Sequence, residues 1–113
     1  VPAFVADLRA KWGRGELPFY FVQIAPFNYE GADGTSAARL REVQLQNMKD
    51  IPNSGMVTTM DVGHPVFIHP VDKETVGNRL AYWALAQTYG MIKDSDTLLL
   101  FINRWRYRRT KSI

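Results

Sequence analysis

One histidine in this sequence stands where a general base could work. His69 lies in the tripeptide Ile68-His69-Pro70, after a short apolar segment that ends near Met60 and before an amphipathic segment that begins near Asp72. Imidazole changes its charge near neutral pH, so a loop histidine can take a proton from a hydroxyl group and return it. A loop histidine more often faces water or bonds to backbone, so the elements around His69 decide its interpretation.

Helix and strand patterns alternate around this histidine. Residues 4–12, 36–49 and 72–89 have the apolar spacing of helices, and residues 19–24 and 56–60 have the apolar composition of buried strands. This order predicts an α/β fold with a parallel sheet, in which His69 lies beyond the carboxyl end of a strand, where such sheets place their ligands. Two strands are too few for a buried parallel sheet, so we expect further strands outside this chain.

The same patterns predict which side chains the helices bury and where the helices begin and end. We expect Ser36 and Asp72 as N-caps and Gly90 just after the last helix. The expected buried stripes are Phe4, Leu8 and Trp12 in the first helix, Leu40, Val43 and Met48 in the second, and Val76, Leu80 and Trp83 in the third.

Composition limits the classes of protein to consider. The 113 residues fit one small domain, 46% of them are hydrophobic, and none is cysteine, which excludes disulfides and a thiolate nucleophile. The first residue is Val1 rather than Met, and we expect truncation to have set this end. No apolar run approaches the roughly 20 residues of a membrane helix, so no membrane partner is expected. Basic residues crowd the last ten positions, and the rest is slightly acidic, which gives no reason to expect a nucleic-acid partner.

Several blocks of this sequence, in one order, resemble a known family. They are Asp7–Gly13, Leu17–Tyr29, Arg41–Gln44, Asn53–Thr59 and the Ile-His-Pro loop with its Val-Gly-x-Arg-Leu-Ala helix. Together they are similar to the sialate O-acetylesterases, a branch of the SGNH hydrolases. The resemblance covers residues 1–92 and implies the C-terminal part of a three-layer α/β/α SGNH-hydrolase (flavodoxin-like) domain with a parallel sheet.

The resemblance also implies an activity and a role for His69. Family members hydrolyse acetyl esters on sialic acid or related sugars with a serine nucleophile and no metal or organic cofactor, and His69 matches their general base and acid. Their Gly-Gln-Ser-Asn nucleophile block has no counterpart here, and the expected role of Ser36 is that of a cap. The partner expected for the parent enzyme is an acetylated sugar. A missing N-terminal half and a second copy both remain open as protein partners, and the compartment is undetermined among the secreted, periplasmic and lysosomal locations common in the family.

The sequence departs from the family beside this histidine. The family usually has aspartate where this chain has Phe67, and phenylalanine cannot accept the Nδ1 proton of His69. Asp61 is the candidate for a replacement orienting carboxylate, with a backbone carbonyl or water as alternatives. A metal site made of Asp61, His64, His69 and Asp72 is a weaker interpretation, because their spacing fits no known ligand signature.

Two further hypotheses come from what the chain lacks and how it ends. Without a nucleophile, a non-catalytic remnant or interaction module with the same fold elements is the main alternative to an esterase. Residues 93–113 form an atypical basic tail, and the codons that can encode Lys93–Asp96 can also encode, in another frame, the family's Gly-Phe-Arg-Tyr. We therefore interpret the tail as a possible frameshift product, against the alternatives of an edge strand at Leu98–Ile102 or a nucleic-acid contact.

Overall fold

The structure, a computed structural model, describes residues 1–29 and 35–91. The elements, in chain order, are α1 (Pro2–Trp12), β1 (Phe19–Val22), α2 (Ser36–Asp50), β2 (Ser54–Val57), α3 (Lys73–Trp83) and the π-helical turn η1 (Ala84–Thr88). The chain divides into two compact units, residues 1–80 and 81–113. The hypotheses about the tail, and most of the loop predicted before α2, lie outside the described residues.

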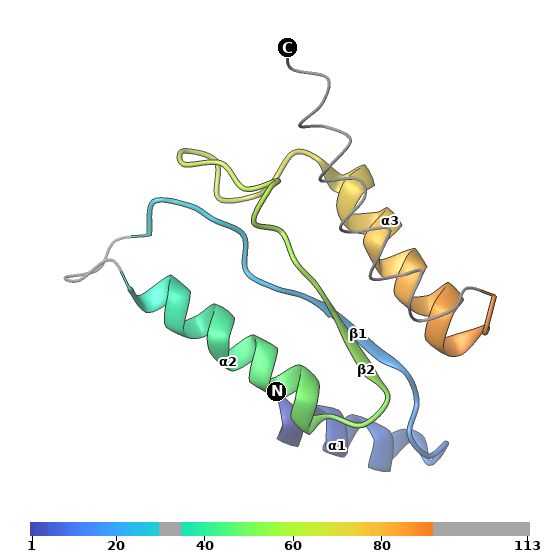
Figure 1. Ribbon diagram of the computed structural model, residues 1–113. Coiled ribbons are helices and arrows are strands. Elements are labelled where there is room, and N and C mark those ends of the chain that lie inside the picture. The colour runs from blue at the N-terminus through green and yellow to red at the C-terminus, as the bar shows by residue number, and fades with distance from the viewer. Residues whose placement is uncertain (30–34, 92–113) are drawn as a thin grey trace. The chain divides into compact units, whose positions relative to one another are not determined.

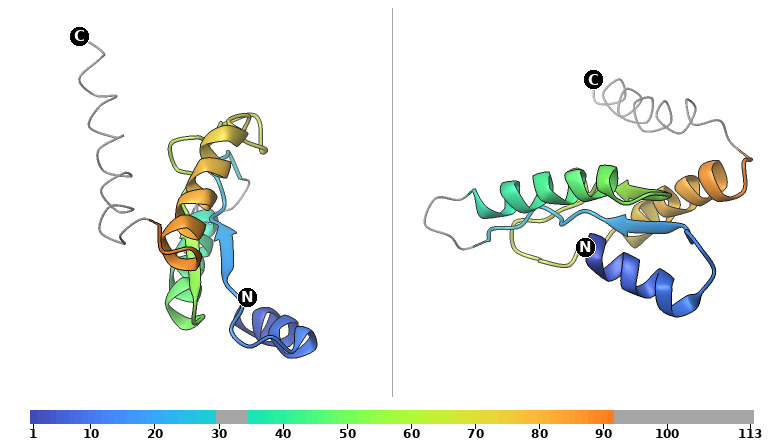
Figure 2. Two further views of the ribbon diagram at one scale, coloured as in Figure 1. Left: turned by 90° about the vertical axis from the view of Figure 1, so that its right-hand side faces the viewer. Right: turned by 90° about the horizontal axis from the view of Figure 1, so that it is seen from below.

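The two strands pair in parallel, which confirms the predicted α/β fold. β1 and β2 are aligned from Phe19 opposite Ser54 to Val22 opposite Val57, with α2 as their crossover connection. Figure 1 shows the strands side by side, and the two views of Figure 2 place α1 and α2 on opposite sides of β1. Helices on both sides of a parallel sheet are the arrangement expected of the α/β class.

Both strands end earlier than the sequence predicted, because side chains take over the backbone groups beyond them. The Gln23 amide still donates to the Val57 carbonyl at 2.8 Å, but the Ile24 amide donates to the Gln44 Oε1 atom of α2 at 2.9 Å. After β2, the Thr58 carbonyl accepts from Arg79 of α3. The ladder therefore stops at the point where the chain turns toward the His69 loop.

The buried face of α1 differs from the predicted one. Phe4 and Trp12 are 60% and 63% exposed, whereas Val5 is 1% exposed and faces the core. Arg9, one helical turn later on the same face, donates to the carbonyls of Leu17 and Pro52 at 2.6 and 2.8 Å. The rotation of α1 about its axis is thus set by the burial of Val5 and by the hydrogen bonds of Arg9 to backbone carbonyls. The spacing of apolar residues does not reveal these contacts.

The predicted stripe of α2 is also wrong in part. Leu40 and Val43 are exposed, Met48 is half-buried, and no residue of this helix is buried. The N-cap is Thr35 rather than the predicted Ser36, and the Thr35 side chain makes no capping hydrogen bond. Polar contacts hold α2 instead: Gln23 Nε2 donates to the Arg41 carbonyl at 3.0 Å, and Ser54 Oγ donates to the Met48 carbonyl at 3.0 Å.

The start of α3 is as predicted. Its first turn is capped by Asp72, whose Oδ1 accepts from the Thr75 amide at 2.9 Å while Oδ2 accepts from the Thr75 hydroxyl at 2.6 Å. Within the first unit, Val76 and Leu80 are half-buried and Thr75 is buried. A carboxylate cap thus fixes the residue at which the His69 loop passes into the helix.

The described part of the second unit continues this helix in a wider turn. Trp83 is half-buried, and the Tyr89 amide donates to the Ala84 carbonyl at 3.0 Å, five residues back. Gly90 then takes a φ of 61°, a conformation that glycine adopts at little cost. The predicted helix end at Gly90 is confirmed, and the π-helical turn before it was not predicted.

Candidate functional site

His69 is exposed and borders a cavity at the carboxyl ends of the two strands, as the sequence predicted for its position. The cavity has a volume of about 310 Å³. The cavity is lined by four segments: the end of β1 with the residues after it, the start of the segment after β2, the His69 loop and the first turns of α3. Residues of these segments that line it include Gln23, Ala25, Tyr29, Thr59, His69 and Lys73. The His69 side chain makes no hydrogen bond to another described residue, so its imidazole is available to an incoming group.

A buried and a half-buried hydrogen bond fix the chain segments that line the bottom of this cavity. Thr59 is 1% exposed, and its hydroxyl donates to the Gln23 carbonyl at 2.9 Å. Tyr29 closes the next turn, where its hydroxyl donates to the Ala25 carbonyl at 2.8 Å. Among the described residues, no buried side-chain nitrogen or oxygen atom lacks a partner. The hydrogen bond between Thr59 and Gln23 resists separation of the two strand ends, because each buried polar group would then lose its partner.

The second loop histidine has a structural role. His64 Nδ1 accepts hydrogen bonds from the amides of Val66 and Phe67 at 3.1 and 3.2 Å, which closes a tight turn before His69. The Phe67 ring lies against the His64 ring, with centroids 4.8 Å apart. Phe67 therefore packs on the turn, at the position where the resemblance leads one to expect an orienting aspartate.

A close backbone approach holds the middle of the loop against the chain that follows β1. A Cβ atom on Gly63 would lie 2.6 Å from the Pro26 carbonyl oxygen and 2.5 Å from Pro26 Cδ, distances that real Cβ atoms do not reach. Two residues later the Pro65 carbonyl accepts from the Asn28 amide at 3.3 Å. The close contact with Pro26 is what requires glycine at position 63. The backbone conformation does not require it, because the φ of Gly63 lies outside the left-handed region.

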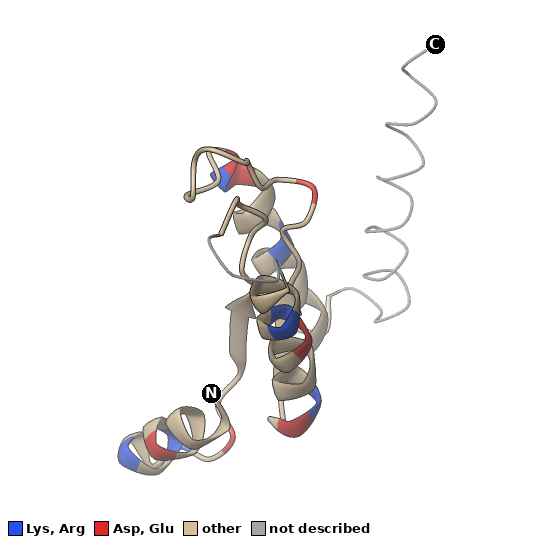
Figure 3. Cartoon of the chain, turned by 90° about the vertical axis from the view of Figure 1, so that its left-hand side faces the viewer, with Lys and Arg blue, Asp and Glu red and all other residues tan. Residues whose placement is uncertain are grey.

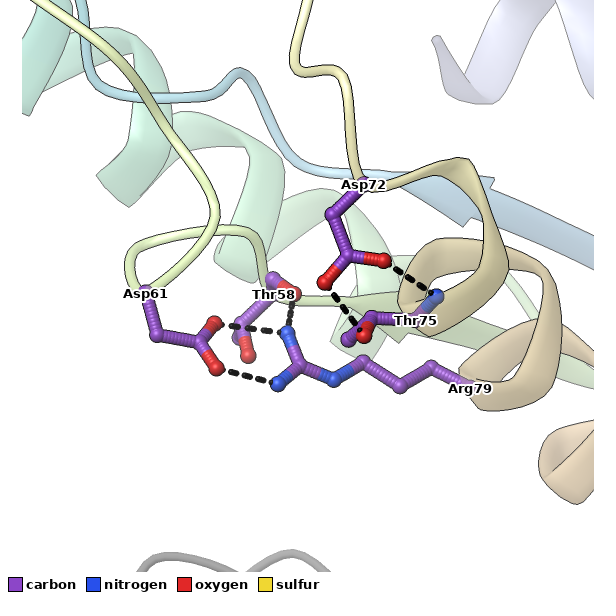
Figure 4. A network of polar contacts seen from close by, with 5 residues as sticks. All are labelled: Thr58, Asp61, Asp72, Thr75 and Arg79. Atoms are coloured by element: carbon purple, nitrogen blue, oxygen red, sulfur yellow. Dashed lines mark hydrogen bonds and ion pairs between the residues drawn. The ribbon is translucent and has the colours of Figure 1, made fainter. Parts of the chain in front are cut away.

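An arginine of α3 holds the start of the loop. Arg79 Nη1 donates to the Thr58 carbonyl and to Asp61 Oδ1, both at 2.7 Å, and its Nη2 donates to Asp61 Oδ2 at 2.5 Å. Figure 4 shows this fork beside the Asp72 cap. The Arg79 side chain is only 13% exposed, and that of Asp61 is 39% exposed. A two-pronged contact between a guanidinium and a carboxylate is among the stronger polar contacts in proteins, and partial burial limits its screening by salt.

The predicted site residues are therefore only partly brought together. Asp61 and His69 belong to one loop, but the Asp61 oxygens lie on Arg79, and neither oxygen is hydrogen-bonded to His69. Within the described ranges, no group of three or more histidine, cysteine, aspartate or glutamate side chains is placed to hold a metal ion. Asp61, His64, His69 and Asp72 are thus not gathered around one point.

Arg79 and Gly63 were both missed as site residues by sequence reasoning. In the sequence, Arg79 stood out only as part of the Val-Gly-x-Arg-Leu-Ala pattern. Its position seven residues after the Asp72 cap was the feature that could have indicated a role at the site. That spacing is two helical turns, which returns to the side of the helix where the cap lies. Gly63 carried no comparable signal, since a loop glycine has many possible causes.

Charges of both signs are mixed over the part of the chain that the structure describes. Figure 3 shows acidic and basic residues interspersed along the helices and the loop. Among the described residues that line the cavity there is one lysine, Lys73, and no carboxylate. No helix among the described residues is long and apolar enough to cross a membrane.

Comparisons with known proteins place this chain beside a solved enzyme structure. No family model and no curated protein matches this chain. A solved structure does: a carbohydrate acetylesterase from Xanthomonas citri, which is 36% identical in sequence and superposes with a TM-score of 0.72. The likeness covers 79% of this chain and 21% of the esterase, so the chain spans about a fifth of that enzyme. By fold and sequence, most of this chain is similar to one part of a carbohydrate acetylesterase.

Proposed function

We propose that this chain is part of a carbohydrate esterase that removes acetyl groups from sugars. The observation that carries the proposal is the 36% identity to a carbohydrate acetylesterase over 79% of the chain. It is supported by an exposed histidine beside a cavity at the carboxyl edge of a parallel sheet, the edge where α/β proteins carry out their chemistry. The resemblance to sialate O-acetylesterases suggests sialic acid or a related sugar as the substrate and the SGNH group as the wider family.

In the proposed mechanism, His69 serves first as base and then as acid. It takes the proton of a serine hydroxyl as that oxygen attacks the acetyl carbonyl, and the acetyl group is transferred to the serine. The proton then passes from His69 to the departing sugar oxygen, so the sugar leaves as an alcohol. His69 next takes a proton from a water molecule as that water attacks the acetyl-serine, and it passes this proton to the serine oxygen as acetate is released. None of these steps uses a metal or an organic cofactor.

The serine of this mechanism is proposed to come from a part of the enzyme beyond this chain. Ser54 donates to the carbonyls of Met48 and Ile51 at 3.0 and 2.8 Å, far along the chain from His69 and outside the cavity lining. Ser36 begins α2 and does not line the cavity either. Exposed apolar side chains on α1 and α2, such as Phe4, Trp12 and Val43, are proposed to be covered by the same missing part.

Asp61 enters this proposal through Arg79. Its carboxylate fixes the start of the His69 loop, and the direct acceptor for His69 Nδ1 is then a backbone carbonyl, a water molecule or a group from the missing part. A non-catalytic interaction module is the second candidate. The packing of Phe67 on His64, where an orienting aspartate is expected, is the observation that favours it.

A graft tests the proposed function. The matching fifth of the Xanthomonas citri carbohydrate acetylesterase is replaced by residues 1–91 of this chain, and hydrolysis of an acetylated sugar and of p-nitrophenyl acetate is measured. We expect the graft to hydrolyse both esters, because the enzyme supplies the remaining machinery and this chain supplies the histidine. A folded graft with no activity above background contradicts the esterase proposal and favours the interaction module.

The isolated chain should not hydrolyse acetyl esters. A general base without a nucleophile and oxyanion hole lacks both the covalent step and the main electrostatic contribution to catalysis. With p-nitrophenyl acetate, the expected rate is no greater than that of free imidazole at the same concentration. Saturable turnover well above that rate, lost in His69→Ala, would contradict the proposal that the nucleophile lies elsewhere.

A further inference from the structure

Both ends of the loop that carries His69 are held by one helix. At the start of the loop, Arg79 binds the Thr58 carbonyl and both oxygens of Asp61. At its end, Asp72 accepts from the amide and the hydroxyl of Thr75. Thr75 and Arg79 are four residues apart in α3 and therefore lie on the same side of that helix, as Figure 4 shows.

The Arg79 contact is suited to fixing an orientation. Its planar guanidinium donates from two nitrogens to a carboxylate and, at the same time, to a carbonyl three residues earlier in the chain. Lysine has a single donor centre and cannot reproduce this fork. The Arg79 side chain is 13% exposed, so water is largely excluded from around it. Replacing Arg79 with an apolar residue would remove the donor that the Asp61 carboxylate and the Thr58 carbonyl share.

Between the two anchors, the contacts that hold the middle of the loop lie before the segment that carries His69. The turn at His64 and the contacts of Gly63 and Pro65 with the chain after β1 hold its middle. The segment from Ile68 to Val71 is exposed apart from Pro70, and His69 lies within it. The position of the imidazole over the cavity therefore depends on contacts elsewhere in the loop, including the anchors at each end, because ordering the exposed residues costs conformational entropy that those contacts offset.

We propose that Arg79 is a positioning residue for His69: by clamping Thr58 and Asp61 to α3, it holds the loop of residues 58–72 so that the imidazole stays at the cavity. The catalytic importance of this clamp rests on the proposed function. The contacts of Arg79 with Thr58 and Asp61 are independent of that function. Arg79 touches no reacting group in this proposal and acts only through the loop.

Amide hydrogen exchange and NMR on the full chain test this role. Arg79→Met keeps the apolar stem and removes the fork. The reporters are the amides of Val66 and Phe67 within the loop, and the amide of Gln23, which bonds across the strands, is the internal standard. We expect the exchange of the loop amides to rise by about tenfold or more relative to Gln23, the equivalent of roughly 1.4 kcal/mol. The ring resonances of His69 should shift in the same variant.

The matched control is Arg9→Met. Arg9 also donates to backbone carbonyls, those of Leu17, Pro52 and Asn53, but it does so away from the His69 loop. This variant should leave the ratio of loop to strand exchange and the His69 ring resonances unchanged, even if it lowers stability. An unchanged ratio in Arg79→Met, or an equal change in Arg9→Met, would overturn the proposal.

Arg79→Lys and Asp61→Asn supply the same measurement if Arg79→Met fails to fold by circular dichroism. Each keeps part of the contact, so each should raise the loop-to-strand ratio, and by less than the full loss of the fork. No change in the ratio in either folded variant overturns the proposal. None of these measurements requires ester hydrolysis. An inactive graft would therefore not contradict the proposed role of Arg79. Unchanged exchange of the loop amides in these variants would likewise not contradict the esterase proposal.

Discussion

His69→Ala should abolish the activity of the esterase graft almost completely. Loss of the histidine base removes proton transfer both to and from the serine, and in serine hydrolases losses of this kind reach several powers of ten in kcat. We expect kcat for acetyl ester hydrolysis to fall by at least about 10³-fold, with a much smaller change in KM, because the imidazole acts on the transition state more than on the bound ester. Steady-state kinetics of the graft and the variant provide the measurement.

The control for this experiment lies two residues away. Val71 is 84% exposed and belongs to the same loop, and its side chain is not among those that line the cavity. Val71→Ala in the graft should keep kcat and KM close to those of the parent graft. Retention of more than about a tenth of kcat in His69→Ala would show that His69 is not the base, since a true base contributes far more.

The order of elements could be predicted because it depends on local pattern. Apolar spacing along 4–12, 36–49 and 72–89 and the apolar runs at 19–24 and 56–60 require only neighbours along the chain, and every element appears in the structure. The cap at Asp72 and the glycine at position 90 are local signals of the same kind. The position of His69 in the loop beyond β2 followed from the same order of elements.

The buried faces and the contacts of the site could not be predicted in the same way. Val5 rather than Phe4 faces the core of the described part, because the rotation of a helix is set by what packs against it. Asp61 was one candidate for orienting His69, beside a backbone carbonyl or water, yet its oxygens lie on an arginine 18 residues later in the sequence. Pairing between charged groups across such a separation depends on how the loop and α3 meet, and sequence spacing alone does not contain that information.

The contact of Gly63 with Pro26 has an equally specific consequence. In Gly63→Ala, the added methyl group would lie 2.6 Å from the Pro26 carbonyl oxygen, and a backbone atom cannot swing aside as a flexible side chain can. The loop or the chain after β1 must move instead. Forced displacement of this kind typically costs about 1 to 3 kcal/mol of unfolding free energy. Urea denaturation followed by circular dichroism measures the loss as a lower midpoint at an unchanged slope.

Gly77→Ala is the matched control for this substitution, and the opposite sign is expected. Gly77 lies inside α3, its φ is not positive, and a Cβ atom there would meet nothing within 4 Å. The same chemical change should therefore raise the unfolding free energy by about 0.5 to 1 kcal/mol, because alanine favours a helix over the flexible unfolded chain. A Gly63→Ala protein as stable as the parent would mean that the loop does not press against Pro26. In that case the hydrogen bond from the Asn28 amide to the Pro65 carbonyl and the turn at His64 would hold the middle of the His69 loop without help from Gly63.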